Sequence, residues 1–160
     1  MRSRARLAGH AVHPMLIAFP LGLLVTAVIF DVLFYASARD SFAVVAAHTT
    51  AAGVIGGVVA SFFGWVDWYA VPSRTRAKRV GLLHGLGNMA VLVLFAISWM
   101  LRLDQPTWQP PVLAFVLAVV GLVVATIAAW LGGELVERLG MGVDESANLN
   151  APSSLARPSH

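Results

Sequence analysis

The sequence predicts an all-α integral membrane protein that folds as a four-helix up-down bundle. Its composition is the first reason: of 160 residues, 58% are hydrophobic and 12% are charged, whereas a soluble domain usually carries about 25% charged residues. A small globule cannot bury this much apolar material, so we expect lipid to be the solvent. The second reason is that the apolar residues form four long blocks, and the third is that the connectors between the blocks are short.

The four apolar blocks cover about residues 15–35, 42–66, 80–101 and 111–133. Each block reaches the roughly 20 residues that a helix needs to cross a hydrocarbon core. Continuous apolar runs favour helices over a β-barrel, whose strands alternate between apolar and polar residues. Short connectors place consecutive helices antiparallel to one another, which makes the up-down bundle the natural architecture.

We expect two parts, a four-helix transmembrane domain at residues 1–139 and a flexible cytoplasmic tail at residues 140–160. The tail contains Ser, Pro, Ala and Asn without an apolar period, a composition that cannot build a packed core. The sequence has no cysteine, which excludes disulfides and thiolate metal sites. It also contains no nucleophile motif and no phosphate-binding loop, so we identify no catalytic residue and disfavour hydrolytic chemistry.

The Lys and Arg residues predict the orientation of the bundle in the membrane. Nine of the eleven lie at the N-terminus, in the second connector or after the fourth block. Because cytoplasmic loops carry an excess of basic residues, we predict that both termini are cytoplasmic. The basic residues form no continuous stripe, so we expect no nucleic-acid partner. A cleaved signal peptide is the alternative for the first block, against which stand the length of the block and the presence of Asp31.

All four predicted helices bring polar side chains to the cytoplasmic end of the bundle: His10 and His13, Asp67, His84 with Asn88, and Glu134. Ionisable groups within membrane spans are costly, so each is a candidate functional residue. His84 and Asn88 are four residues apart and therefore share a helical face. We predict that His13 and His84 bind a cofactor or metal and that Asn88, Asp67 and Glu134 belong to the same cofactor site. Asp67 and Glu134 either orient the histidines or are ordinary interfacial carboxylates.

A second polar pair is expected in the outer half of the bundle. Asp31 lies near the outer end of the first predicted helix, and His48 lies about two turns into the second. Their depths in the membrane match roughly. We predict a buried hydrogen bond between this carboxylate and this imidazole, because each would otherwise be unpaired in lipid.

The second predicted helix carries a ridge of small residues, Ala52, Gly56, Ala60 and Gly64, at intervals of four. Small residues at this spacing allow another helix to approach closely. Packing between helices is the first interpretation of the ridge, and contact with a flat cofactor is the second. Glycines also flank His84, at Gly81 and Gly85, and could give a cofactor room.

Several segments of the sequence resemble a bacterial family of small membrane proteins catalogued as domain of unknown function 2231. The matching segments are "GHAVHPMLIAFPLGL" at 9–23, "FGWVDW" at 63–68, "RAKRVGLLHGLGN" at 76–88, "WLGGELVERLGMGVD" at 130–144 and "NAPSSL" at 150–155. The resemblance implies a multi-pass protein of the bacterial inner membrane. The residues that fall on the family's pattern are His13, Pro14, Phe19, Pro20, Asp67, His84, Asn88 and Gly133.

The leading functional hypothesis is a membrane-embedded redox or cofactor-binding subunit. In its sharpest form His13 and His84 are the axial ligands of a b-type haem, an arrangement that suits electron transfer because neither axial position is left free for substrate. In other forms the same cluster binds a quinone head group or a divalent metal. A redox partner protein or a larger membrane complex would then exchange electrons with it.

The alternative hypothesis belongs to a different class, a structural or assembly subunit of a larger membrane complex. The small-residue ridges would then be docking surfaces for another subunit, and the histidines would be satisfied polar groups. A transporter is disfavoured, because the middle of the bundle offers few polar side chains to line a path.

Overall fold

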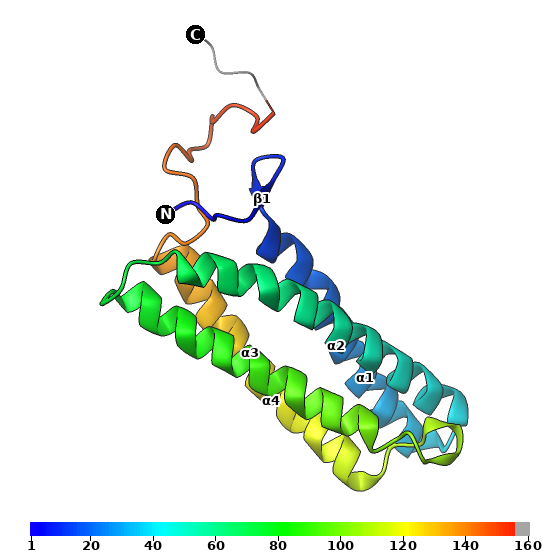
Figure 1. The fold of residues 1–160 in the computed structure, drawn as a ribbon. Coiled ribbons are helices and arrows are strands. Elements are labelled where there is room, and N and C mark those ends of the chain that lie inside the picture. The colour runs from blue at the N-terminus through cyan, green and yellow to red at the C-terminus, as the bar shows by residue number, and fades with distance from the viewer. Residues whose placement is uncertain (156–160) are drawn as a thin grey trace.

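A computed structural model describes residues 1–155 of the chain, and it is dominated by four long helices (Figure 1). The helices are α1 (Val12–Ser37), α2 (Asp40–Tyr69), α3 (Arg76–Met100) and α4 (Val112–Gly133). Each is long and apolar enough to cross a membrane. The predicted all-α membrane bundle is therefore confirmed, and each helix contains nearly all of the apolar block that predicted it.

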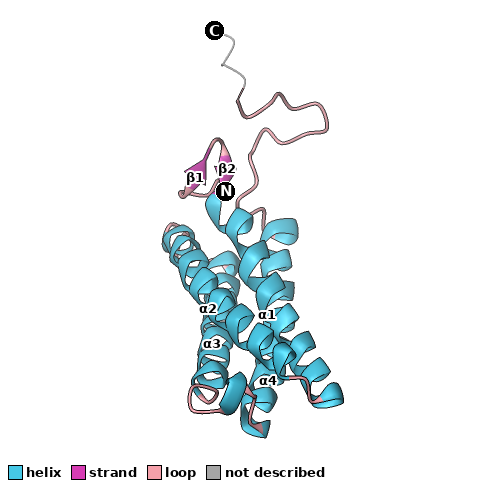
Figure 2. Cartoon of the chain, turned by 90° about the vertical axis from the view of Figure 1, so that its right-hand side faces the viewer, coloured by secondary structure: helices cyan, strands magenta, loops and turns pink. Residues whose placement is uncertain are grey.

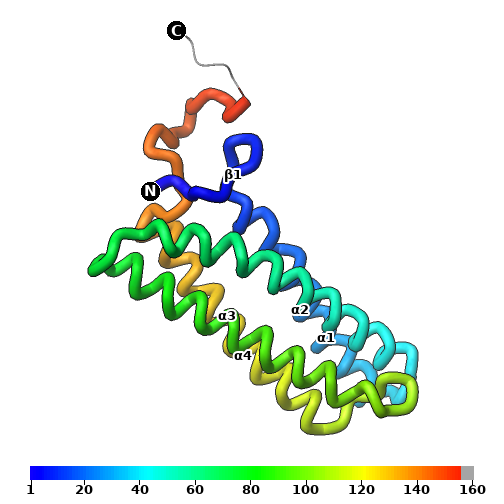
Figure 3. Tube along the Cα trace, viewed as in Figure 1, coloured from blue at the N-terminus to red at the C-terminus, as the bar shows by residue number. Residues whose placement is uncertain are grey.

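The helices form two antiparallel hairpins, α1 with α2 and α3 with α4, which lie against one another along the bundle (Figures 1 and 3). The N-terminus and the residues after α4 lie at the same end, which we call the terminal end. The α2–α3 connector is also there. The opposite end, which we call the far end, carries the α1–α2 turn, the α3–α4 connector and the short 3-10 helix η1 (Pro106–Trp108).

Local backbone features end the helices where the hairpins turn. Ala38 adopts a left-handed conformation (φ 53°) after α1, and its N–H donates to the carbonyl oxygen of Phe34 at 2.7 Å, which satisfies an otherwise free carbonyl. At the start of α3, the hydroxyl of Thr75 accepts a hydrogen bond from the backbone N–H of Lys78 at 3.1 Å. This is the usual capping of a helix N-terminus by Thr. After Gly133 the chain continues as a short π-helix, η2 (Glu134–Arg138).

The two hairpins repeat one packing arrangement, which the sequence analysis did not detect. A Cβ atom added at Gly53 in α2 would lie 2.7 Å from Cδ2 of Leu24 in α1. In the other hairpin, a Cβ atom added at Gly121 in α4 would lie 2.8 Å from Cε2 of Phe95 in α3. Leu24 and Phe95 are 71 positions apart, and Gly53 and Gly121 are 68 apart. In each hairpin, a glycine of the second helix therefore makes room for a large side chain at the equivalent position of the first helix.

Because α1 and α3 start at the same end, the two hairpins have the same direction through the membrane (Figure 3). Such parallel repeats are related by an approximate two-fold axis along the bundle, and in repeat-built membrane proteins binding sites lie at the interface between the repeats. The interface between the hairpins is therefore the place to look for a site.

The far half of this interface holds a fully buried ion pair between Asp31 of α1 and Arg102, which follows α3. The guanidinium donates from Nη1 to Oδ1 at 2.6 Å and from Nη2 to Oδ2 at 2.7 Å. It also donates from Nε to the carbonyl of Ser98 at 3.3 Å. Both side chains have no exposed surface. Asp31 and Arg102 are again 71 positions apart, so the pair crosses the repeat axis.

The prediction of an Asp31–His48 pair is therefore wrong. His48 lies on an exposed face of α2, where its Nδ1 bonds to the carbonyl of Val44 at 2.7 Å and its ring approaches that of Trp108. Arg102 is the better partner for Asp31, because its planar fork satisfies both carboxylate oxygens and its charge neutralises them. In the sequence, Arg102 directly follows the third apolar block.

The small-residue ridge of α2 packs within its own hairpin. A Cβ atom at Gly56 would lie 3.4 Å from Cδ1 of Phe19, and one at Gly64 would lie 3.1 Å from Cε1 of His13, both on α1. Ala60 is 2% exposed. Helix packing, the first interpretation of the ridge, is what the contacts show. Gly56 and Gly64 of the ridge thus face α1 of the same chain.

A small hairpin covers part of the terminal end, formed by β1 (Arg6–Leu7) and β2 (His10–Ala11) (Figure 2). Its turn places Ala8 and Gly9 at positive φ, 49° and 85°, as a two-residue turn requires. The sequence analysis predicted no strand here.

Residues 140–155 contain turns but no helix, and they contact the N-terminal segment. Arg2 pairs with Asp144 at 2.8 Å, and the hydroxyl of Ser154 donates to the carbonyl of Ala8 at 3.2 Å. Hydrogen bonds from Ser146 and Arg2 hold the pKa of Asp144 below its ordinary value. The boundary at residue 139 and the flexibility of the tail stay predictions, and residues 156–160, with Arg157, lie outside the described residues.

Candidate functional site

A cavity of about 410 Å³ opens between the two hairpins in the terminal half of the bundle. Helices α1, α2, α3 and α4 all contribute to its wall, and the first three residues of the chain with Met141 and Gly142 cover its terminal side. Apolar side chains form most of the wall, and a few polar groups point inward. This is the composition of most small-molecule sites, whose volumes run from about 300 to 1,000 Å³.

His13, in the first turn of α1, reaches across to the backbone of α2. Its Nδ1 lies 2.8 Å from the carbonyl oxygen of Ala60. Gly64, one turn further along α2, leaves the space that the imidazole occupies, with 3.1 Å between Cε1 of His13 and the position of the missing Cβ. A larger residue at position 64 would push the ring away from the carbonyl.

His84 of α3 makes the same contact with α4. Its Nδ1 lies 2.8 Å from the carbonyl oxygen of Ala128, and Gly132, one turn further, leaves the space for the ring. His13 and His84 are 71 positions apart, whereas Ala60 and Ala128, like Gly64 and Gly132, are 68 apart. The two histidines are thus equivalent positions of the repeat, and they meet at its axis.

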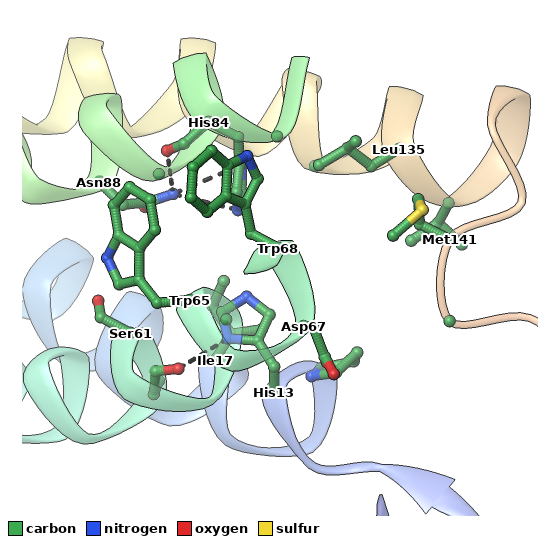
Figure 4. Close-up of a pocket in the computed structure, with 18 of the residues that line it drawn as sticks. His13, Ile17, Ser61, Trp65, Asp67, Trp68, His84, Asn88, Leu135 and Met141 are labelled. Carbon is green, nitrogen blue, oxygen red and sulfur yellow. Dashed lines mark hydrogen bonds between the residues drawn. The ribbon is translucent and has the colours of Figure 1, made fainter. Parts of the chain in front are cut away.

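These contacts determine which nitrogen of each imidazole is available. A carbonyl oxygen can only accept a hydrogen bond, so Nδ1 of each ring must carry the proton. In a neutral imidazole, Nε2 then keeps a free lone pair, able to accept a hydrogen bond or bind a metal. The ring centroids of His13 and His84 are 6.3 Å apart, with perpendicular planes. Figure 4 shows the two rings on opposite sides of the cavity.

Asn88 lies beside His84, as the spacing of four residues predicted (Figure 4). Its side-chain amide donates to the carbonyl oxygen of His84 at 2.9 Å, and the same nitrogen lies 3.3 Å from Nε2 of His84. Asn88 also lines the cavity. The structure therefore brings three of the predicted site residues, His13, His84 and Asn88, into one cavity.

Asp67 lines the same cavity. The sequence analysis expected it to orient a histidine, but its carboxylate has other partners. Its carboxylate accepts three hydrogen bonds from the N-terminal segment: from the hydroxyl of Ser3 at 2.6 Å and from the backbone N–H groups of Arg4 and Ala5 at 2.7 and 3.1 Å. Three donors leave this carboxylate no need of an imidazole partner. Asp67 instead anchors the segment that covers the terminal side of the cavity.

Glu134 and His10, unlike Asp67, do not line the cavity. Glu134 pairs with Arg76 at 2.5 Å, a contact between the ends of α4 and α3. His10 stands in β2 and bonds through Nδ1 to the carbonyl of Ala8. Glu134 is the first residue of η2, and its carboxylate pairs with Arg76 of α3 and does not line the cavity. The prediction that Glu134 orients the histidines is wrong.

Two tryptophans of α2, Trp65 and Trp68, form much of one side of the cavity. Trp65 packs on Gly85 of α3, where an added Cβ would lie 3.0 Å from its Cη2. Trp68 packs on Gly81, with 2.8 Å between its Cδ1 and the corresponding position. The glycines beside His84 therefore receive indole rings, so they leave less room for a cofactor than expected.

Comparison with known proteins agrees with this architecture. A family model described as a predicted membrane protein, DUF2231, matches residues 9–145. The chain belongs to this family. No curated protein and no solved structure matches the chain. The match covers all four helices, with His13 and His84, so it includes the helical walls of the cavity.

The polar groups of this DUF2231 protein give the cavity a restricted chemistry. Within residues 1–155, no group of three or more His, Asp or Glu side chains could hold a metal ion. The cavity is lined by two imidazoles, the amide of Asn88, the hydroxyl of Ser61, the carboxylate of Asp67 and aromatic walls. The amide nitrogen of Asn88 lies 3.3 Å from Nε2 of His84. Such a site can hold a ring compound by stacking and hydrogen bonding, or place two axial ligands on one metal.

Proposed function

We propose that this DUF2231 protein is a membrane-embedded redox subunit that binds a quinol-type cofactor in the cavity, against the His13–His84 pair. The observation that carries the proposal is the pair of equivalent imidazoles, each held through Nδ1 by a backbone carbonyl and each presenting Nε2 to one cavity. The reduced form of a quinone, a quinol, carries hydroxyl donors on a flat ring, and an Nε2 atom without a proton accepts from such a donor. Because the two ring centroids are 6.3 Å apart, the quinol ring would lie beside the histidine pair and not between its members.

The walls support a ring compound of moderate size. The cavity of about 410 Å³ lies at the lower end of the range for small-molecule sites. The indole of Trp65 offers a flat face on which a quinone ring could stack. The amide of Asn88 adds a hydrogen-bond donor beside His84.

A b-type haem is the second candidate, and one observation favours it. Two imidazoles that bind one metal from opposite sides have ring centroids roughly 6 Å apart, because each metal–nitrogen bond is about 2 Å long. The observed separation is 6.3 Å. Against haem, Trp65 and Trp68 occupy the glycine positions that would make room for a porphyrin. These tryptophans would have to move, so we rank the smaller cofactor first.

The setting of the site follows from the charge distribution. We propose that the protein resides in the inner membrane of a bacterium with both termini in the cytoplasm, because the terminal end carries most of the basic residues. The cavity would then lie in the cytoplasmic half of the membrane. A cytoplasmic or membrane-bound redox partner would exchange electrons with it there.

The test is to identify what the purified protein holds. The protein is extracted in detergent, and its organic extract is analysed for quinones while absorption spectra are recorded before and after dithionite reduction. We expect a co-purified quinone that falls by about tenfold or more in His13→Ala and in His84→Ala, since about 1.4 kcal/mol of lost hydrogen bonding is tenfold in affinity. His48→Ala, which changes an exposed histidine in the far half of the bundle, is the matched control.

The other outcomes separate the candidates. A Soret band that sharpens on reduction and disappears in His13→Ala or His84→Ala would establish the haem form instead. If neither a quinone nor a haem is found after expression with both available, or if both variants retain it fully, the redox proposal fails. The assembly-subunit hypothesis would then be the one to pursue.

A further inference from the structure

The α2–α3 connector forms one edge of the terminal end of the bundle (Figures 1 and 2), and basic side chains stand on it and beside it. Arg74 and Arg79 are exposed, and no carboxylate in the described part of the chain pairs with either. Lys78 has no carboxylate partner there. Its Nζ donates instead to the carbonyl oxygen of Trp68 at 2.8 Å and lies 5.7 Å from the ring centroid of Tyr69. We call Tyr69, Arg74, Lys78 and Arg79 the basic corner.

Other arginines at the same end of the bundle differ from those of the basic corner. Arg2 pairs with Asp144, and Arg76 pairs with Glu134. Because each ion pair carries no net charge, these arginines attract an anion only weakly. The basic corner keeps the full charge of its Lys and Arg side chains, which are protonated at neutral pH. The rule that relates basic residues to orientation counts paired and unpaired cations alike, so it does not account for this difference.

The basic corner lies where the lipid-facing surfaces of α2 and α3 end. On α2, the exposed apolar residues Phe62 and Val66 lead to Tyr69, which is 82% exposed. On α3, Arg79 precedes Leu83 by four residues and therefore shares its helical face, and Leu83 is 58% exposed. The corner thus stands at the depth where the hydrocarbon core gives way to the headgroups.

We propose that the basic corner binds the phosphate of an anionic phospholipid, whose acyl chains lie along the exposed apolar residues of α2 and α3. A guanidinium can donate two parallel hydrogen bonds to one phosphate, and neither Arg74 nor Arg79 has a carboxylate that competes for it in the described residues. An exposed tyrosine such as Tyr69 is typical of the headgroup level. In the proposed orientation this end meets the cytoplasmic leaflet, whose anionic lipids attract basic segments.

The position of the corner favours a lipid over a soluble phosphate. A phospholipid presents its phosphate at the level where the apolar helix faces end, which is where Arg79 stands above Leu83. Its chains then continue along those faces in place of ordinary bilayer lipid. A soluble phosphate would gain nothing from this level. The proposal goes beyond the proposed function, because no residue of the basic corner lines the cavity.

The test is native mass spectrometry of the purified protein in detergent, titrated with dioleoyl phosphatidylglycerol or dioleoyl phosphatidylcholine. The two lipids share their chains and their phosphate, but only phosphatidylglycerol carries a net negative charge. The corner variant is Arg74→Gln/Arg79→Gln. The matched control is Arg39→Gln/Arg138→Gln, which removes the same charge from two exposed arginines outside the basic corner. Monodisperse elution and an unchanged Tm establish that each variant is folded.

We expect the unmodified protein to bind phosphatidylglycerol at least about tenfold more tightly than phosphatidylcholine. The corner variant should lose about tenfold or more of its affinity for phosphatidylglycerol, with less than about twofold change for phosphatidylcholine. The control variant should keep its affinity for phosphatidylglycerol within about twofold. Equal losses in the two variants would overturn the proposal, because the attraction would then come from the net charge of the protein. Equal binding of both lipids, or of neither, would overturn it as well.

A competition experiment separates a lipid from a soluble ligand. sn-Glycerol 3-phosphate carries the phosphate without the chains, and at equal concentration it should not displace phosphatidylglycerol. Displacement would show that the corner is a site for soluble phosphate esters and would overturn the lipid seat. These outcomes leave the proposed function untouched, because the cavity and the basic corner share no residue.

Discussion

At the scale of single residues, hydrogen bonds to backbone carbonyls decide what the histidines can do. Nδ1 of His13 and Nδ1 of His84 each form a hydrogen bond with a backbone carbonyl oxygen of the neighbouring helix, at 2.8 Å in both cases. A carbonyl partner is known to set the tautomer and the orientation of metal-binding histidines, and it does the same for a histidine that accepts a hydrogen bond. The free Nε2 atoms are therefore a property of α2 and α4 as much as of the histidines.

The Asp31–Arg102 pair makes a prediction at this scale. Asp31→Ala leaves the Arg102 charge fully buried without a partner, and breaking such a pair usually costs about 3–5 kcal/mol. We expect a loss of this size in the free energy of unfolding, measured by denaturant titration in detergent micelles. The double variant Asp31→Leu/Arg102→Leu should recover most of it, because two apolar side chains leave no buried charge.

Asp40→Ala is the control for this experiment, since Asp40 is exposed and accepts one hydrogen bond from Gln109. It should cost less than about 1 kcal/mol. If Asp31→Ala costs no more than Asp40→Ala, the ion pair does not stabilise the interface between the hairpins.

At the scale of helices and segments, glycines determine where the bundle admits large side chains. Gly64 and Gly132 make room for the imidazoles, and Gly81 and Gly85 make room for the indoles. An added Cβ atom at Gly133 would meet no neighbour within 4 Å. A glycine in a membrane helix is often explained by close approach of another helix. Here the contacts at the other four glycines come from side chains. These glycines therefore determine the shape of the cavity wall.

Gly132→Val tests this role. A Cβ atom at position 132 would already lie 3.0 Å from Cε1 of His84, so a valine must displace the imidazole from the carbonyl of Ala128. We expect a loss of about 1–3 kcal/mol in stability, the usual cost of overpacking. The imidazole ¹⁵N resonances of His84 should also show that Nδ1 no longer carries the proton in a fixed tautomer.

Gly22→Val provides the comparison, since a side chain at position 22 meets no neighbour within 4 Å. Its histidine resonances should match those of the unmodified protein. Unchanged resonances in Gly132→Val as well would contradict the view that Gly132 positions His84.

The N-terminal segment gives a second prediction at the scale of elements. Asp67→Asn replaces a carboxylate that accepts three hydrogen bonds with an amide that has one accepting oxygen. We expect the backbone amides of Arg4 and Ala5 to exchange with deuterium about tenfold faster, since about 1.4 kcal/mol of lost hydrogen bonding is tenfold in the opening equilibrium.

Glu134→Gln is the matched carboxylate-to-amide control at the same end of the bundle, because it weakens the contact with Arg76 and not the anchor. Hydrogen exchange measured by mass spectrometry on the N-terminal peptide distinguishes the two. Equal exchange in both variants would show that Asp67 is not the anchor of the segment.

At the scale of the whole molecule, the repeat of two hairpins organises both polar centres. His13 meets His84 in the terminal half, and Asp31 meets Arg102 in the far half. Both pairs join positions 71 apart across the interface between the repeats. The repeat is not exact, because Trp65 of α2 packs on Gly85, whereas the equivalent position in α4 is Gly133, where an added Cβ atom would meet nothing within 4 Å.

Orientation in the membrane is a prediction at this scale. The sequence has no cysteine, so Ser73→Cys in the α2–α3 connector and Asp104→Cys in the α3–α4 connector each introduce a single reactive thiol at an exposed position. In intact spheroplasts, a membrane-impermeant maleimide should label Asp104→Cys, whereas Ser73→Cys should react only after permeabilisation. The reverse pattern would place both termini outside the cytoplasm and contradict the charge argument.

The sequence by itself determined the four helices, and it predicted that His13, Asp67, His84 and Asn88 lie at one level of the bundle, where all four line one cavity. Apolar blocks of membrane-spanning length permit little other than helices in lipid. The depth of a polar residue along a helix follows from counting at 1.5 Å per residue, so residues at equal depth could be matched. The spacing of four also placed Asn88 beside His84 correctly.

Only the tertiary structure decided which groups at one depth meet. Depth does not specify the rotation of a helix about its axis, and that rotation turns Glu134 away from the cavity and Asp67 toward the N-terminal segment. The tertiary structure also pairs Asp31 of α1 with Arg102, which lies just beyond the end of α3. The offset of 71 between Asp31 and Arg102, shared by His13 and His84, was the signal in the sequence that could have found the pair. The difference between Trp65 and Gly133 could not be predicted for the same reason, because the two positions are recognised as equivalent only once the hairpins are superposed in space.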